Sequence, residues 1–140
     1  MAKTKKTNKT MWVVAAAVVV ALAVGGALMY IHKHPSKITV TENQSNIEVK
    51  KGQQFTISLA SNASTGYSWS VDDTYNKNVI TKVSNKYQAA NTNMSGAPGK
   101  ELWVFKGANK GSTKLNFKYT RSWEANMSPA SSKTFDVTVK

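Results

Sequence analysis

The fold is decided by the stretch Lys114-Leu115-Asn116-Phe117-Lys118-Tyr119-Thr120, in which large apolar residues alternate with polar ones. Successive side chains of a β-strand point to opposite faces, so this pattern predicts a strand with one buried face. The same alternation occurs at Phe55, Ile57 and Leu59. From Ile38 to the C-terminus no sustained helical period appears, and we therefore expect this region to consist of strands.

Turn residues divide the same region into roughly seven short strands. This pattern predicts an all-β domain, an immunoglobulin-like antiparallel β-sandwich. Its apolar stripe supplies enough large side chains to hold the fold without a disulfide. The expected strands are a broken first strand over Ile38–Val49, followed by Gln53–Ala60, Tyr67–Val71, Asn76–Tyr87, Lys100–Lys106, Leu115–Tyr119 and Phe135–Val139.

The N-terminal part has a different composition. Met11 to Ile31 is an uncharged run of 21 residues, which as a helix would span about 31 Å, the thickness of a bilayer core. Lysines cluster before this run, so the positive-inside rule places the N-terminus in the cytoplasm. We expect a basic cytoplasmic tail at residues 1–10, one transmembrane helix at 11–31, a tether at 32–37 and an extracytoplasmic domain at 38–140.

A cleaved secretory signal is the alternative interpretation of the apolar run, because small residues that could form a cleavage site lie near its end. Signal cores usually have about 7–15 apolar residues, and this run is longer, which favours a retained single-pass anchor. If the segment is cleaved, the domain is secreted. In both cases the domain is expected to act outside the cytoplasm.

Composition excludes most catalytic chemistry in the domain. The chain has no cysteine, and its only histidines are His32 and His34, beside the apolar run. A thiolate nucleophile, a Ser-His-Asp base and a histidine zinc site are therefore not expected, and we predict neither an enzyme nor a cofactor. Residues 38–140 carry thirteen Lys or Arg against seven Asp or Glu. These lysines are scattered singly, so we do not expect the domain to bind nucleic acid. We expect the domain to be monomeric.

Three segments are candidate binding loops, because each interrupts the alternating pattern between two expected strands. Alternate connections of a sandwich gather at one end, so the three segments can form one surface. Glycines free the backbone there, and an arginine and a tryptophan are typical of recognition surfaces. Taken singly, each segment also fits an ordinary turn. The segments are Asn62-Ala63-Ser64-Thr65-Gly66-Tyr67-Ser68-Trp69, Gly96-Ala97-Pro98-Gly99 and Arg121-Ser122-Trp123-Glu124.

In order and spacing, these three segments together resemble the chagasin-type inhibitors of cysteine peptidases. The resemblance covers the chain from about Ile38 to the C-terminus. It implies an immunoglobulin-like fold whose clustered loops reversibly and non-covalently plug the active-site cleft of a papain-like cysteine peptidase. The peptidase-binding residues that it implies are Asn62, Ser64, Thr65, Gly66, Tyr67, Gly96, Pro98, Gly99, Arg121 and Trp123.

Two positions depart from the family's usual pattern. Ala63 and Ser122 stand where the family usually has proline. Proline lowers the ordering cost of binding, so we expect these loops to be less preorganised and the affinity or target preference to differ. The alternative function is a membrane-anchored adhesion or surface-binding module, which would use sheet faces or edge strands instead of the loops.

Overall fold

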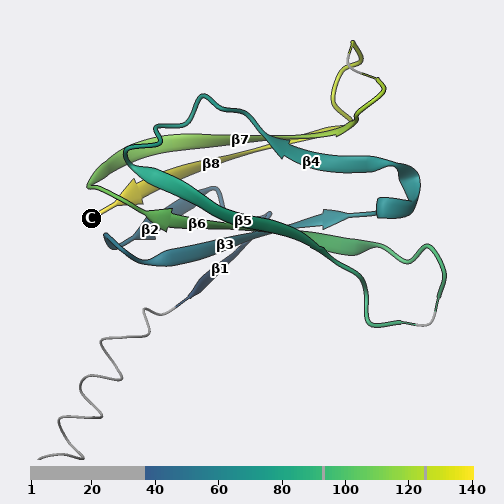
Figure 1. Ribbon diagram of the computed structural model, residues 1–140, viewed down its shortest axis with the longest axis horizontal. Coiled ribbons are helices and arrows are strands. Elements are labelled where there is room, and N and C mark those ends of the chain that lie inside the picture. The colour runs from purple at the N-terminus through teal and green to yellow at the C-terminus, as the bar shows by residue number, and fades with distance from the viewer. Residues whose placement is uncertain (1–36, 93, 125) are drawn as a thin grey trace, which may run out of the picture. The chain divides into compact units, whose positions relative to one another are not determined.

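The computed structural model describes residues 37–92, 94–124 and 126–140, which form eight strands and one short 3₁₀ helix (Figure 1). No helix in these residues is long and apolar enough to cross a membrane. The predicted tail and transmembrane helix, and the predicted tether up to residue 36, lie outside the described residues. The elements are β1 (Ile38–Thr41), β2 (Asn46–Val49), β3 (Gln54–Ser61), η1 (Ala63–Thr65), β4 (Tyr67–Val71), β5 (Ile80–Gln88), β6 (Gly99–Gly107), β7 (Gly111–Arg121) and β8 (Ser131–Val139).

The strands form two four-stranded sheets, which confirms an all-β sandwich. One sheet has the order β1-β3-β6-β5 and the other the order β2-β8-β7-β4. The expectation of purely antiparallel pairing is wrong at two edges, because β1 pairs with β3 and β2 with β8 in parallel. The reason is a turn after β1, where the amide of Gln44 donates to the carbonyl of Thr41 at 3.0 Å. This turn passes the chain from one sheet to the other, so the expected break in the first strand gives two separate edge strands.

The core follows the predicted alternation. Phe117 is fully buried and meets the rings of Trp103, Phe105 and Phe135 edge-on, with centroids 5.3–6.4 Å apart. Such edge-to-face pairs stabilise a core beyond the area they bury. Strand β5 begins at Ile80, later than expected, because the amide of Val79 bonds to the carbonyl of Asn76 in a turn.

A buried carboxylate joins the two sheets. Glu101 on β6 is 8% exposed, and its Oε1 accepts from the Ser61 hydroxyl at 2.9 Å and from the Trp69 amide at 3.0 Å. Trp69 lies on β4, the edge strand of the other sheet, where an amide that faces away from β7 has no neighbouring strand to bond. Such a buried amide needs another partner. Glu101 therefore satisfies an edge-strand donor where the chain crosses from β3 to β4.

Replacing this carboxylate should lower stability. We expect Glu101→Gln to reduce the free energy of unfolding by about 1–2 kcal/mol, because hydrogen bonds to a charged acceptor are stronger than those to an amide. The matched control is Glu48→Gln, since the Glu48 side chain is 65% exposed and forms a surface ion pair with Lys140. Thermal unfolding of both variants checks this, and equal midpoints would contradict the role of Glu101.

Candidate functional site

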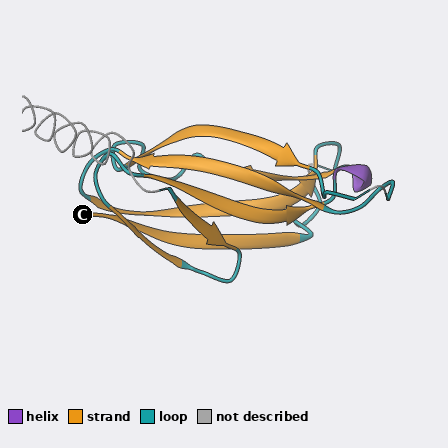
Figure 2. Ribbon diagram, turned by 90° about the horizontal axis from the view of Figure 1, so that it is seen from below, coloured by secondary structure: helices purple, strands orange, loops and turns teal. Residues whose placement is uncertain are grey.

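The three predicted loops lie at one end of the sandwich in both views (Figures 1 and 2). We call this surface the loop end: the described residues of 62–66, 89–98 and 122–130. One hydrogen bond joins its first and second segments, and another ties its first segment to the last residue of β7, directly before the third segment. The Asn62 Nδ2 donates to the carbonyl of Gly96 at 3.3 Å, and the Arg121 Nε donates to the carbonyl of Thr65 at 3.1 Å. The convergence predicted from the sequence is thus present.

Asn62 shapes the first loop through its side chain. It is the N-cap of η1, with extended backbone angles, and its Oδ1 accepts from the Ser64 amide at 3.1 Å and the Ser64 hydroxyl at 2.6 Å. The Thr65 hydroxyl in turn donates to the carbonyl of Asn62 at 2.6 Å. An asparagine cap satisfies amides that the helix leaves unpaired. These bonds keep Ser64 and Thr65 exposed at the tip of a tight turn.

Gly66 closes that turn and contacts Trp123 of the third loop. Its φ of 77° lies in the left-handed region, which glycine adopts without strain. A Cβ built on Gly66 would lie 2.2 Å from Cη2 of the Trp123 indole. The indole therefore packs on the bare backbone of Gly66, while 67% of Trp123 stays exposed. The glycine is needed both for the turn and for this contact.

A stack of side chains connects Trp123 to the core. The Tyr119 ring lies 4.9 Å from Trp69 and 5.2 Å from Tyr67, measured between centroids. The Arg121 guanidinium then lies 4.3 Å from the Tyr67 ring and 5.9 Å from the Trp123 ring. Strand register explains this order, since Trp69 pairs with Tyr119 and Tyr67 with Arg121. Trp123 is thus positioned by packed residues of β4 and β7.

Arg121 and Tyr67 have internal roles that the sequence did not indicate. Arg121 donates Nε to the carbonyl of Thr65 and Nη1 to Glu124 at 3.2 Å, with about a third of each charged side chain exposed. Arg121, which the resemblance places among the peptidase-binding residues, thus braces the first loop against the third in the free protein. The Tyr119 hydroxyl adds a further brace by accepting from the Asn62 amide at 2.9 Å.

The second loop contributes exposed residues and one buried glycine. Gly96, with φ of 75°, and Pro98 are exposed, but Gly99 is buried as the first residue of β6. A Cβ on Gly99 would meet the Gln88 carbonyl at 2.4 Å and the Tyr87 hydroxyl at 2.5 Å. Gly99 is therefore a packing position in the free protein, and its assignment as a peptidase-binding residue stays a prediction.

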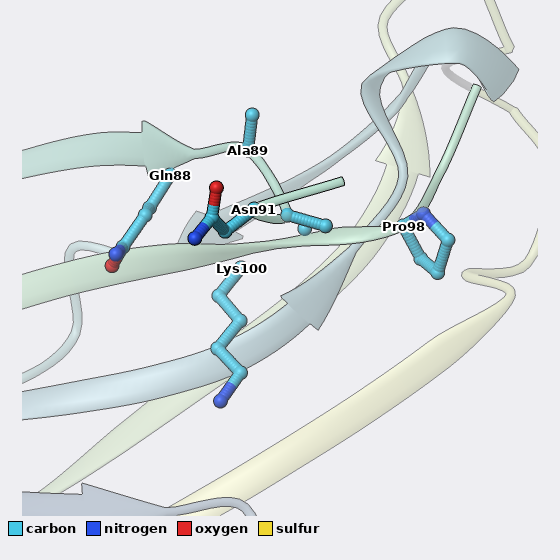
Figure 3. Close-up of a pocket in the computed structure, with 7 residues that line it drawn as sticks. Gln88, Ala89, Asn91, Pro98 and Lys100 are labelled. Atoms are coloured by element: carbon cyan, nitrogen blue, oxygen red, sulfur yellow. The ribbon is translucent and has the colours of Figure 1, made fainter. Parts of the chain in front are cut away.

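A hollow of about 250 Å³ opens at the base of the second loop (Figure 3). Its labelled residues Gln88, Ala89 and Asn91 come from the end of β5 and the chain after it, whereas Pro98 directly precedes β6 and Lys100 lies at its start. The amide groups of Gln88 and Asn91 and the ammonium of Lys100 are the polar groups of this lining, and Ala89 and Pro98 are apolar. The loop end thus has a concave part beside the convex first and third loops.

Two exposed methionines were missed by the sequence analysis. Met94 is 75% exposed on the second loop, and Met127 is 68% exposed on the third. With Trp123 they make three of the five exposed large hydrophobic residues of the described chain, the others being Val83 and Tyr87 on β5. Apolar side chains left in solvent mark interaction sites. The feature of the sequence that could have identified them is a single large apolar residue inside each of these polar loops.

The ionisable side chains at and near the loop end can be compared with the requirements of a metal site. The described residues contain no cluster of three or more His, Cys, Asp or Glu that could hold a metal. Glu124, the acid of the third loop, is paired with Arg121. Among the described residues, Asp72 has a clear pKa shift: the Thr74 hydroxyl, donating at 2.6 Å, lowers the pKa of this carboxyl group. Asp72 follows the far end of β4, away from the loops.

Comparisons with known proteins agree with this geometry. The family model described as Chagasin family peptidase inhibitor I42 matches residues 48–139, more than half of the chain. Amoebiasin-2 of Entamoeba histolytica is 24% identical over 103 residues, which cover 74% of this chain and 84% of that protein. The family match runs from within β2 to the last residue of β8 and includes all three loops.

Solved structures show the same fold. The crystal structure of the cysteine protease inhibitor EhICP2 from Entamoeba histolytica superposes with a TM-score of 0.67 at 24% identity, covering 76% of this chain and 98% of that one. The solution structure of Amebosin gives a TM-score of 0.61 at 29% identity, covering 76% of this chain and all of that one. The described domain therefore has the architecture of these proteins across almost their whole length.

Proposed function

Because this chain belongs to the chagasin family of peptidase inhibitors, we propose that its loop end enters and blocks the active-site cleft of a papain-like cysteine peptidase. The protein is an inhibitor and not an enzyme. The observation that carries the proposal is the contact between Trp123 and Gly66, which joins an exposed indole to the tip of the first loop. A braced surface with an exposed aromatic anchor is what a tight, reversible interface requires.

The proposed mechanism needs no covalent step. Ser64 and Thr65 present small side chains at the tip of a turn that η1 and its cap hold in place. Such a tip can occupy a narrow slot without offering an extended peptide bond in a position for cleavage. Trp123 and Pro98, both exposed, would contact the two walls of the cleft. Inhibition then follows from occupation of the cleft and is reversible.

The partner class is supported by a relative and by charge. EhICP2, whose fold this domain shares, is a cysteine protease inhibitor. Residues 38–140 have an excess of six positive charges, which favours association with a negatively charged enzyme surface. The sheet faces and edges required by the adhesion alternative lack a comparable cluster, since Val83 and Tyr87 are the two large hydrophobic residues exposed on described strands. We propose one inhibitor domain per peptidase.

We propose that the domain acts outside the cytoplasm, held by a membrane anchor over Met11–Ile31. The support is the length of this uncharged run and the lysines before it. Protease protection of the full chain expressed in membrane vesicles tests this location. If protease added to the cytoplasmic face of intact vesicles digests the domain, the proposed orientation is wrong.

The inhibitory activity is tested by titrating the full chain, in a mild detergent, against papain and a lysosomal cathepsin. A serine peptidase serves as the control in the same detergent. We expect reversible inhibition of the two cysteine peptidases, with activity recovered on dilution, and no effect on the serine peptidase. Equal inhibition of all three enzymes, or cleavage of the chain at the first loop, would contradict the proposal.

Restoring a proline at position 63 should tighten inhibition. Ala63 is exposed at the first position of η1, where proline is favoured, and Asn62 before it has φ of −126° and ψ of 99°, close to the conformation that precedes proline. We expect Ala63→Pro to lower the inhibition constant about two- to fivefold by reducing the disorder of the free loop. Titration against papain checks this, and a higher constant would show that the loop must move to bind.

A further inference from the structure

The domain keeps both of its methionines on the loop end. The chain has five methionines, three of which precede residue 37. The other two, Met94 and Met127, are 75% and 68% exposed, while the core is built from Phe, Trp, Tyr, Ile, Leu and Val. Methionine is ordinarily among the residues most often buried. Its exclusion from this core and its presence on two of the three loops require an explanation.

We propose that Met94 and Met127 form an oxidation-sensitive site, through which a peroxide weakens inhibition of the peptidase. This inference rests on the proposed function, because it assigns both side chains to the surface that meets the enzyme. An unbranched thioether adapts to an irregular apolar surface and makes favourable contacts with aromatic rings. Both methionines would therefore add adaptable apolar contacts beside the rigid Trp123.

The chemistry requires only a peroxide as the oxidant. A thioether sulfur attacks one peroxide oxygen, the O–O bond breaks and an S–O bond forms. The sulfur is oxidised by two electrons to a sulfoxide, and the peroxide is reduced to water. The product is polar and bulkier than the thioether, which disrupts methionine-rich interfaces, and methionine sulfoxide reductases reverse it. No cysteine in the chain competes for the oxidant.

Exposure makes both sulfurs accessible, and neither residue supports the fold. The hydrogen bonds that the structure gives Met94 and Met127 are made by their main chains: the Met94 amide donates to the Thr92 hydroxyl at 3.2 Å, the Met94 carbonyl accepts from the Ala97 amide at 3.4 Å, and the Met127 amide donates to the carbonyl of Glu124 at 3.0 Å. Oxidation of the side chains should therefore leave thermal unfolding unchanged. A loss of inhibition without a loss of stability is the signature that distinguishes this site from oxidative damage to a core.

The test compares the full chain with a Met94→Leu, Met127→Leu double variant, which keeps side-chain volume and apolarity. Both proteins are treated with hydrogen peroxide, and catalase then removes the peroxide so that the peptidase thiol is not attacked. Mass spectrometry confirms a sulfoxide at each position. We expect the inhibition constant of the oxidised parent to rise about tenfold, that of the treated double variant to stay unchanged, and sulfoxide reductases to restore the parent.

The outcomes separate this inference from the proposed function. If the untreated parent does not inhibit, the proposed function fails and this inference fails with it. If the untreated parent inhibits but its oxidised form inhibits equally well, only the oxidation-sensitive site is wrong. If the treated double variant loses inhibition as much as the parent, the sensitive group is elsewhere, at Trp123 or in the N-terminal segment, and the assignment to Met94 and Met127 is overturned.

Discussion

Trp123→Ala is expected to weaken inhibition of a papain-like peptidase by about 2 kcal/mol or more, roughly thirtyfold in the inhibition constant. The indole is 67% exposed in the free protein, so most of its surface is available to a partner. It is also held in place by Gly66 and by the Arg121 side chain, which lowers the cost of ordering it on binding. The free energy of unfolding should change by less than about 0.5 kcal/mol, as for other exposed side chains.

The matched control for this variant is Val83→Ala. Val83 is also a large exposed apolar residue, 49% accessible, but it lies at a bulge within β5 instead of on a loop. Titration against papain should show no change for Val83→Ala. A Trp123→Ala protein that inhibits as well as the parent would remove Trp123 from the interface, whereas equal losses in both variants would mean that the loss is not specific to the loop end.

Alternation was sufficient to predict most strands because burial imposes the pattern directly. Phe55, Ile57 and Leu59 are all fully buried on β3, as the period of two requires. Strand β5 was the hardest to place, since only Ile80 is buried and the next eight residues are exposed. The parallel pairing of β1 with β3 and of β2 with β8 was missed for a different reason. Four-residue strands show the same alternation in either direction, so only the path of the chain decides how they pair.

The clustering of the three loops could be predicted from sequence, but the contacts of several of their residues could not. Glycine and asparagine favour turns through their own local conformations and hydrogen bonds, so the first loop could be predicted from the sequence. Arg121 was expected to face a partner, yet its Nε is bonded to the Thr65 carbonyl, 56 residues away along the chain. Gly99 resembled a loop glycine, although Tyr87 covers it. Contacts of this kind depend on strand register, which no local pattern contains.

Gly66→Val is expected to weaken inhibition more than any other single loop change, by about fiftyfold or more, because two effects combine. A valine at φ of 77° is strained, and its side chain would occupy the space of the Trp123 indole, whose Cη2 is 2.2 Å from the position of an added Cβ. Since the indole is at the surface, it can swing outward, so the domain still folds. The inhibition constant against papain and the thermal midpoint are the measurements.

Gly52→Val separates the two effects. Gly52 has a similar φ of 83°, but no atom lies within 4 Å of its added Cβ, and it sits between β2 and β3 at the opposite end from the loops. Both variants should lose about 1–2 kcal/mol of unfolding free energy through backbone strain. Only Gly66→Val should lose inhibition. If Gly52→Val weakens inhibition equally, global destabilisation and not the loop end is responsible.

The coupling between Gly66 and Trp123 can then be measured directly in a double-mutant cycle. If Gly66→Val acts mainly by displacing the indole, it should weaken inhibition much less in a Trp123→Ala background than in the parent. Residues in contact commonly show interaction free energies of about 0.5–3 kcal/mol, and we expect at least about 1 kcal/mol here. Additive losses would mean that the first and third loops bind the peptidase independently, so that the contact between them in the free protein would have no part in positioning the anchor.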